Sequence, residues 1–315
     1  MTRRTLGSSD LSVFPLCLGG NVFGWSSDVP QSETVLDAYV AGGGNFIDTA
    51  DSYSAWKAGN VGGESEAIIG AWMTSRGNRA DMIVATKVGK LHSRPGLSAE
   101  NIRLAADESL GRLQSDYIDL YFTHKDDDTV PLQETVEALD ALVRAGKVRA
   151  IGLSNYTPER VSEYVSVARA NGWVLPVAVQ PHYNLVFRSE FETSLAALCA
   201  QLDMGVAPYF GLGAGLLTGK YATADDMTGQ VRAAAAGVYE SDQAWQVVVA
   251  LRDIAAGNGV APATVALAWL RDQPTVTAPI ASARVVEQLP ALMAAATFAL
   301  PVDDAARLSQ LSIGL

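Results

Sequence analysis

The chain has 315 residues, of which 49% are hydrophobic and 18% charged, and its formal net charge at pH 7 is −11. This acidic balance argues against nucleic acid or an anionic membrane surface as a partner, because both carry the same sign of charge. The composition provides apolar material for a large core. No stretch resembles a secretory signal or an apolar membrane span, so we expect a cytoplasmic protein.

Predicted strands and helices alternate along the chain after a small hairpin over residues 5–15, which we expect to lie outside the main body. Short apolar runs are typical of parallel strands covered on both faces. Eight such runs have midpoints near residues 17, 46, 84, 120, 150, 178, 207 and 278. Helical spacing or capping signals predict helices over residues 32–41, 64–73, 98–113, 132–143, 192–202 and 284–296, and another that opens at Thr157 and Pro158.

The number of these repeats predicts an α/β fold in which eight strands close into a (β/α)8 TIM barrel, as one domain over residues 1–315. An open doubly wound sheet is the alternative, but residues 19–24 do not match its G-x-G-x-x-G fingerprint. About 70 residues separate the seventh and eighth strands. The first part of this connection, residues 211–241, lacks clear periodicity, which predicts a long functional loop.

Polar residues follow three consecutive predicted strands, where Asp48, Lys87 and His124 stand at the strand ends. Neighbouring parallel strands lie about 4.8 Å apart, so the three ends are expected within roughly 10 Å of one another at one rim of the barrel. Tyr53, on the loop after the second strand, is expected over the same place. Individually, an Asp at a turn or a Lys at a strand end is ordinary surface chemistry.

Together the four residues describe a proton donor beside a polarised carbonyl. A tyrosine has a reference pKa near 10, and a neighbouring ammonium is expected to lower it. Lys87 would supply that ammonium, and Asp48 would keep the lysine charged in a partly dry pocket. His124 could hydrogen-bond a substrate oxygen or the tyrosine. The set contains no hydride source, so a reduction would need a cofactor, and no metal site is expected.

In this order and spacing, the residues resemble the catalytic tetrad of the aldo-keto reductase family. Other matching segments cover nearly the whole chain, at residues 62–70, 152–155, 180–185 and 215–221. The resemblance implies an NADP(H)-dependent oxidoreductase that reduces an aldehyde or ketone reversibly. By this likeness Tyr53 is the general acid, Lys87 and Asp48 tune it, and His124 orients the carbonyl.

The resemblance also implies a set of cofactor contacts. The carboxamide is expected at Ser154, Asn155 and Gln180, and the nicotinamide ring on Tyr209. Arg284 suits a 2′-phosphate, because a guanidinium can bind it through two hydrogen bonds. The remaining implied contacts are Gly20, Phe210, Gly211, Leu212, Gly215, Lys220, Ser282 and Gln288.

The sequence departs from the family pattern at three places. Phe210-Gly211-Leu212 replaces a common Ser-Pro-Leu, Ala214 replaces an Arg, and Leu292 replaces an Asn that usually accompanies the adenine contact Gln288. We therefore expect fewer polar contacts to the cofactor at these places.

Trp25 and Trp56 are expected to line the substrate pocket, although aromatic walls suit many carbonyl compounds. A different function class also fits the resemblance, since some members resemble NADPH-binding auxiliary β subunits of potassium channels. A barrel hydrolase with two carboxylates is a third reading, which leaves Lys87 and Tyr53 without roles. A small-molecule substrate is the expected partner, and the sequence carries no signal of oligomeric state.

Overall fold

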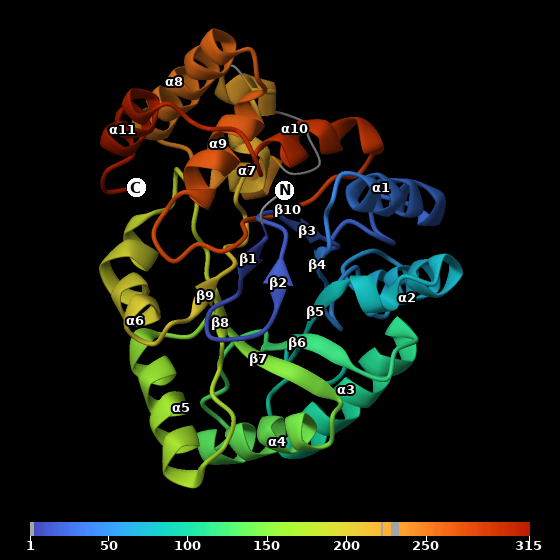
Figure 1. Cartoon of the computed structure of the whole chain (residues 1–315). Coiled ribbons are helices and arrows are strands. Elements are labelled where there is room, and N and C mark those ends of the chain that lie inside the picture. The colour runs from blue at the N-terminus through green and yellow to red at the C-terminus, as the bar shows by residue number, and fades with distance from the viewer. Residues whose placement is uncertain (1–2, 222, 228–232) are drawn as a thin grey trace.

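The computed structural model describes residues 3–221, 223–227 and 233–315. In this part of the chain, eight parallel strands form one sheet in the order β10-β3-β4-β5-β6-β7-β8-β9 (Figure 1). The strands are short and buried, as the apolar runs predicted. Their bounds are β3 (Cys17–Gly19), β4 (Phe46–Asp48), β5 (Ile83–Val88), β6 (Ile118–Thr123), β7 (Val148–Ser154), β8 (Ala178–Gln180), β9 (Gly205–Val206) and β10 (Ile280–Ala281).

The two ends of this strand order meet and close the sheet. Val206 in β9 pairs with Val276 through a parallel bridge. The Thr277 amide donates to the carbonyl of Val206 at 2.8 Å, and the Ile280 amide donates to the carbonyl of Pro208 at 3.0 Å. These bonds join β9 to the segment that leads into β10. The predicted barrel is thereby confirmed, and the open doubly wound sheet is excluded.

Helices surround the strands, and the first six follow the chain around the barrel (Figure 1). The predicted caps hold: the Ser98 side chain accepts from the Asn101 amide, and Thr157 accepts from the Arg160 amide ahead of Pro158. These side chains satisfy amides that the first helical turn leaves unbonded. The bounds are α1 (Val29–Ala41), α2 (Glu64–Arg76), α3 (Ala99–Leu113), α4 (Leu132–Arg144), α5 (Pro158–Asn171) and α6 (Ala196–Gln201).

The N-terminal hairpin of β1 (Arg4–Thr5) and β2 (Ser12–Val13) packs into the barrel, which corrects the prediction that it lies outside the main body. Leu6, Leu11 and Val13 are fully buried and belong to the cluster of side chains that fills the barrel interior. The hairpin turn sits tightly on the barrel, since a Cβ on Gly7 would lie 2.2 Å from a backbone carbonyl. The hairpin closes the amino-terminal end of the barrel, so the barrel interior is open only toward its carboxyl-terminal rim in the described part of the chain.

The connection between β9 and β10 contains more helix than the sequence predicted. Residues 222 and 228–232 of the predicted loop lie outside the described residues, and the rest of 211–241 holds the short segments η3 (Gly213–Thr218), η4 (Ala224–Met227) and α7 (Ala233–Gly237). Two full helices follow, α8 (Asp242–Asn258) and α9 (Pro262–Arg271), which were not predicted. Every residue of α9 after Pro262 is buried, so no polar face marks its helical period.

Element bounds near the C-terminus also differ from the prediction. The expected strand over 276–280 is interrupted because Pro279 has no amide hydrogen, and β10 begins only at Ile280. The last predicted helix starts late, as η5 (Val286–Gln288) followed by α10 (Leu289–Ala294), and α11 (Val302–Leu311) was not expected. The helix predicted over 192–202 opens with the π-helical segment η2 (Phe191–Leu195).

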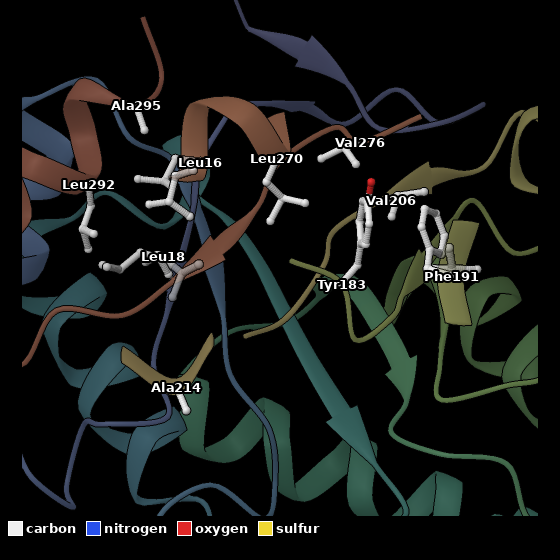
Figure 2. Close-up of a cluster of buried hydrophobic side chains, with 14 of the residues drawn as sticks. Leu16, Leu18, Tyr183, Phe191, Val206, Ala214, Leu270, Val276, Leu292 and Ala295 are labelled. Atoms are coloured by element: carbon white, nitrogen blue, oxygen red, sulfur yellow. The ribbon is translucent and has the colours of Figure 1, made fainter. Parts of the chain in front are cut away.

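A second core fills the layer between strands and outer helices. Figure 2 shows Leu16, which precedes β3, and Leu18 of β3 beside Leu270 of α9 and Leu292 of α10. Cys17 and Cys199 are buried free thiols. Among the described residues, no helix is both long enough and apolar enough to cross a membrane.

Candidate active site

A pocket of about 640 Å³ opens at the carboxyl-terminal rim of the barrel. Its walls come from the ends of strands and the loops after them, the place where a parallel barrel concentrates its polar side chains. One end is lined by Asp48, Tyr53, Trp56 and His124, and the rest by residues that follow β7, β8, β9 and β10.

Asp48, Tyr53 and Lys87 form one hydrogen-bonded group. The Lys87 ammonium donates to Asp48 Oδ2 at 2.7 Å, to the Thr49 carbonyl at 2.7 Å and to Tyr53 Oη at 2.9 Å. Tyr53 Oη donates to Asp48 Oδ2 at 2.9 Å. Lys87 and Asp48 are fully buried, so their ion pair is shielded from water. The phenol oxygen is therefore fixed between a cation and an anion.

Gln180 is tied directly to this group, although the two positions are 132 residues apart. Its side-chain amide donates to Asp48 Oδ1 at 2.8 Å, while its own carbonyl accepts from Ser154 Oγ at 2.9 Å. Sequence reasoning assigned Gln180 to the cofactor alone. The structure shows that it also holds the carboxylate that anchors Lys87.

His124 lies beside the phenol, with its ring centroid 6.0 Å from that of Tyr53. Its Nδ1 faces Ser52 Oγ at 3.4 Å. Burial and the neighbouring ammonium groups of Lys87 and Lys90 lower the pKa of His124 well below its usual value. The imidazole is therefore neutral at pH 7 and carries one N–H donor and one acceptor.

The pKa of Tyr53 is raised well above 10, which corrects the prediction that Lys87 lowers it. Burial is the largest cause, and the Asp48 charge with its hydrogen bond adds to it. Both effects disfavour a phenolate. Burial also lowers the pKa of Lys87, although Asp48 opposes that shift. The phenol consequently keeps its proton at neutral pH.

A stack of rings backs the pocket on the side of Tyr209. The Tyr209 ring lies parallel to His182 at 5.2 Å, and His182 stacks on Phe187 at 3.9 Å. Tyr209 Oη donates to Asn155 Oδ1 at 2.7 Å. Asn155 has a φ of 57°, a left-handed conformation that its short polar side chain tolerates. Tyr209 is thereby presented to the pocket as a fixed flat face.

Two cations stand farther along the pocket. Lys220 lies against Gly215, where a Cβ would come within 3.3 Å of the ammonium. The backbone amide of Arg284 donates to Gln288 Oε1 at 2.8 Å, which fixes the loop ahead of η5. Among the described residues the Arg284 guanidinium makes no ion pair. Ser282 Oγ donates to Asn21 Oδ1 at 2.7 Å across the pocket wall.

Residues 15–313 match the model of the Aldo/keto reductase family. The match spans nearly the whole described barrel, including every residue of the hydrogen-bonded group. The chain belongs to the aldo/keto reductase family.

The chain is also similar to named proteins over most of its length. The chain is 33% identical to Protein tas of Escherichia coli over 89% of each chain. It is 32% identical to a probable voltage-gated potassium channel subunit beta of Oryza sativa over 93% of this chain and 91% of the relative. It is 33% identical to norsolorinic acid reductase B of Aspergillus parasiticus over 91% of this chain and 78% of the relative. As an aldo/keto reductase, the protein is an NAD(P)H-dependent oxidoreductase for small carbonyl substrates.

The pocket fits the dinucleotide that aldo/keto reductases use. It combines the flat Tyr209 face, the amide groups of Asn155 and Gln180, and two cations suited to phosphate. The chemistry that the cofactor supplies when bound is hydride transfer at its nicotinamide ring.

The structure places most of the predicted site residues on the pocket wall. Three do not line it. Lys87 lies behind Asp48 and Tyr53, and Gly20 is turned into the barrel wall, where a Cβ would meet Ser65 Oγ at 2.7 Å. Trp25 packs edge-to-face on Trp56 at 5.6 Å, so it supports the wall from behind. The predicted residues on the wall are Asp48, Tyr53, Trp56, His124, Ser154, Asn155, Gln180, Tyr209, Phe210, Gly211, Leu212, Gly215, Lys220, Ser282, Arg284 and Gln288.

The departures from the family pattern also face the pocket. Ala214 and Leu292 both line it, so the missing Arg and Asn would have projected there. Ala214 and Phe210 have left-handed φ values of 52° and 55°, and such strain concentrates at functional sites.

Sequence reasoning missed other wall residues. Asn21, Ser26 and Thr218 were overlooked because an isolated polar residue on a loop carries no signal of orientation. Lys90 was overlooked for the same reason, although it stands only three residues after Lys87.

Proposed function

We propose that this protein reduces an aldehyde or ketone to the alcohol with NADPH, and that Tyr53 donates the proton. The observation that carries the proposal is the position of Tyr53 Oη, held at 2.9 Å from both Lys87 Nζ and Asp48 Oδ2 on the pocket wall. A carbonyl oxygen bound between Tyr53 and His124 would meet a protonated phenol and a neutral imidazole. Both can donate a hydrogen bond to an oxygen that gains negative charge.

Each residue has a distinct part in this reaction. Tyr53 gives its proton to the carbonyl oxygen, and Lys87 stabilises the phenolate that results. Asp48 and Gln180 keep the ammonium in place. His124 orients the carbonyl, Trp56 covers the pocket beside it with Trp25 behind, and Tyr209 sets the plane of the nicotinamide.

The proposal is tested by NADPH oxidation at 340 nm with the full chain and a panel of aldehydes, ketones and sugars. Turnover of at least one carbonyl class supports it. If NADPH binds but no member of the panel is reduced, the reductase proposal fails.

A regulatory role is the second candidate, because the chain is similar to a probable potassium channel β subunit. On this view NADPH binding would serve as a signal to a partner protein. The two candidates differ in the chemical step. A single-turnover experiment with NADPH and an aldehyde would show hydride transfer if the protein is a reductase, and none if the cofactor is only a ligand.

The pH dependence of the reaction follows from the site. The lowered pKa of His124 keeps the imidazole neutral, and the raised pKa of Tyr53 keeps the phenol protonated. We therefore expect kcat/KM for reduction to stay flat between about pH 6 and pH 8, whereas alcohol oxidation should rise with pH because it needs the phenolate. An acidic limb with a midpoint near 6.5, in rates from stopped-flow or steady-state assays, would contradict a neutral His124.

Arg284 is expected to distinguish NADPH from NADH. Its guanidinium lines the pocket with no ion pair in the described part of the chain, so it is available for a 2′-phosphate. Hydrogen bonds to charged groups contribute about 1.5–3 kcal/mol, so Arg284→Ala should weaken NADPH binding by roughly tenfold or more and leave NADH little changed. Fluorescence titration with both cofactors measures this, and equal weakening of both would show that Arg284 only supports the loop.

A further inference from the structure

Lys90 lines the same end of the pocket as Tyr53, Trp56 and His124. It follows β5 by two residues, and Gly89 turns the chain at that point with a φ of 111°. A Cβ on Gly89 would lie 2.9 Å from Leu97, so the turn packs closely on the loop behind it. Lys90 is therefore set at the mouth of the pocket by a fixed backbone.

The charges on the pocket wall leave this lysine without a role in cofactor binding. The only carboxylate on the described wall is Asp48, which Lys87 neutralises. The proposed function uses Lys220 and Arg284 for phosphates. Lys90 is the remaining cation, and within residues 3–221, 223–227 and 233–315 its ammonium has no ion pair and no hydrogen bond.

The surroundings of Lys90 favour an incoming anion. Lys90 is an exposed residue at the pocket, and desolvation together with the ammonium groups of Lys87 and Lys125 lowers its pKa. Asp126 pairs with Arg160 at 2.7 Å, and Asp127 accepts from the Leu97 amide at 2.8 Å, so neither carboxylate is paired with Lys90. A pocket with unpaired positive charge attracts anions even on a chain of net charge −11.

We infer that Lys90 binds a carboxylate of the substrate, and that the substrate class is a carbonyl compound bearing a carboxylate a few bonds from the reacting carbon. This inference rests on the proposed reductase function. Lys90 stands three residues from Lys87, so their Cα atoms lie within about 10 Å. In such a substrate, a short linker or one aromatic ring separates the carbonyl at Tyr53 from the carboxylate at Lys90. Trp56 supplies an apolar wall for that linker or ring.

The test compares 4-carboxybenzaldehyde with methyl 4-formylbenzoate, which lacks the negative charge and carries one additional methyl group, each with NADPH. The wild type should favour the carboxylate in kcat/KM. Lys90→Met keeps an unbranched side chain that is one atom shorter and removes the charge, so it should lower kcat/KM for the carboxylate about tenfold through KM and leave the ester unchanged. Lys90→Arg should retain most of the preference. Lys125→Met, a charge removal at a residue that does not line the pocket, is the matched control.

Equal loss with both aldehydes would show that Lys90 shapes the pocket, and an unchanged preference would show that it binds no carboxylate. Either result overturns the inference.

A binding measurement separates the Lys90 inference from the reductase proposal. Calorimetric titration of benzoate and of benzamide into the protein with NADPH should show tighter benzoate binding, lost in Lys90→Met. If neither aldehyde is reduced but this difference remains, the reductase proposal fails and the anion site stands; if benzoate binds both proteins equally, the anion site fails.

Discussion

Tyr53→Phe should bind NADPH as the wild type does and lose most of its carbonyl reduction. The substitution removes only the phenol oxygen, the one proton donor that the structure holds between Lys87 and Asp48. General acid catalysis contributes about 10²- to 10⁴-fold to a rate, so we expect kcat to fall by roughly that factor. Single-turnover oxidation of bound NADPH by an aldehyde measures the chemical step directly.

The fold should tolerate this change. The ring of Tyr53 packs edge-on against Trp56 at 6.1 Å and lies under the Lys87 ammonium at 4.4 Å, and phenylalanine keeps both contacts. Lys87 and Asp48 remain bonded to each other at 2.7 Å, so no buried charge is left unpaired. The free energy of unfolding should therefore change by less than about 1 kcal/mol.

Tyr164→Phe is the matched control, because it makes the same chemical change at a buried tyrosine of α5. Its hydroxyl has no hydrogen-bond partner among the described residues. Loss of that hydroxyl should leave turnover unchanged. If Tyr53→Phe retained near wild-type kcat with NADPH binding intact, Tyr53 would have no part in proton transfer.

The strand ends show why much of this site could be predicted from sequence. Asp48, Lys87 and His124 each follow an apolar run, and parallel strands bring such positions to one rim whatever the length of the helices between them. The caps at Ser98 and Thr157 are equally local signals. Each of these signals lies within a few adjacent residues, so it can be recognised from the sequence alone.

Other features depend on contacts between distant segments. The bond from Gln180 to Asp48 joins positions 132 residues apart, and no local pattern indicates it. The direction of the Tyr53 pKa was predicted wrongly because the ammonium was foreseen, whereas the desolvation of the phenol and its bond to Asp48 were not. Helix α9 was missed because its burial on all sides removes the amphipathic period.

Lys87→Met should cost both activity and stability. The ammonium is fully buried and, among the described residues, is one of three donors to the Asp48 carboxylate, the others being Gln180 and Tyr53. Its removal leaves a carboxylate in the barrel interior without a counter-charge. Breaking a buried ion pair on one side costs about 3–5 kcal/mol, so urea unfolding should show a loss of that order. Reduction should also fall about 100-fold or more, because the phenolate that forms would have no cation beside it.

The double variant Lys87→Met with Asp48→Asn separates the two effects. Replacing both charges leaves neutral groups of similar size, which for buried pairs is often close to neutral in stability. The double variant should therefore regain most of the lost free energy of unfolding and still fail to reduce aldehydes. The coupling between the two substitutions, measured as a double-mutant cycle in urea, should be a few kcal/mol. Equal stability of Lys87→Met and the double variant would contradict this expectation. It would mean that Gln180, Tyr53 and the barrel backbone stabilise the Asp48 charge, and that Lys87 serves the chemistry alone.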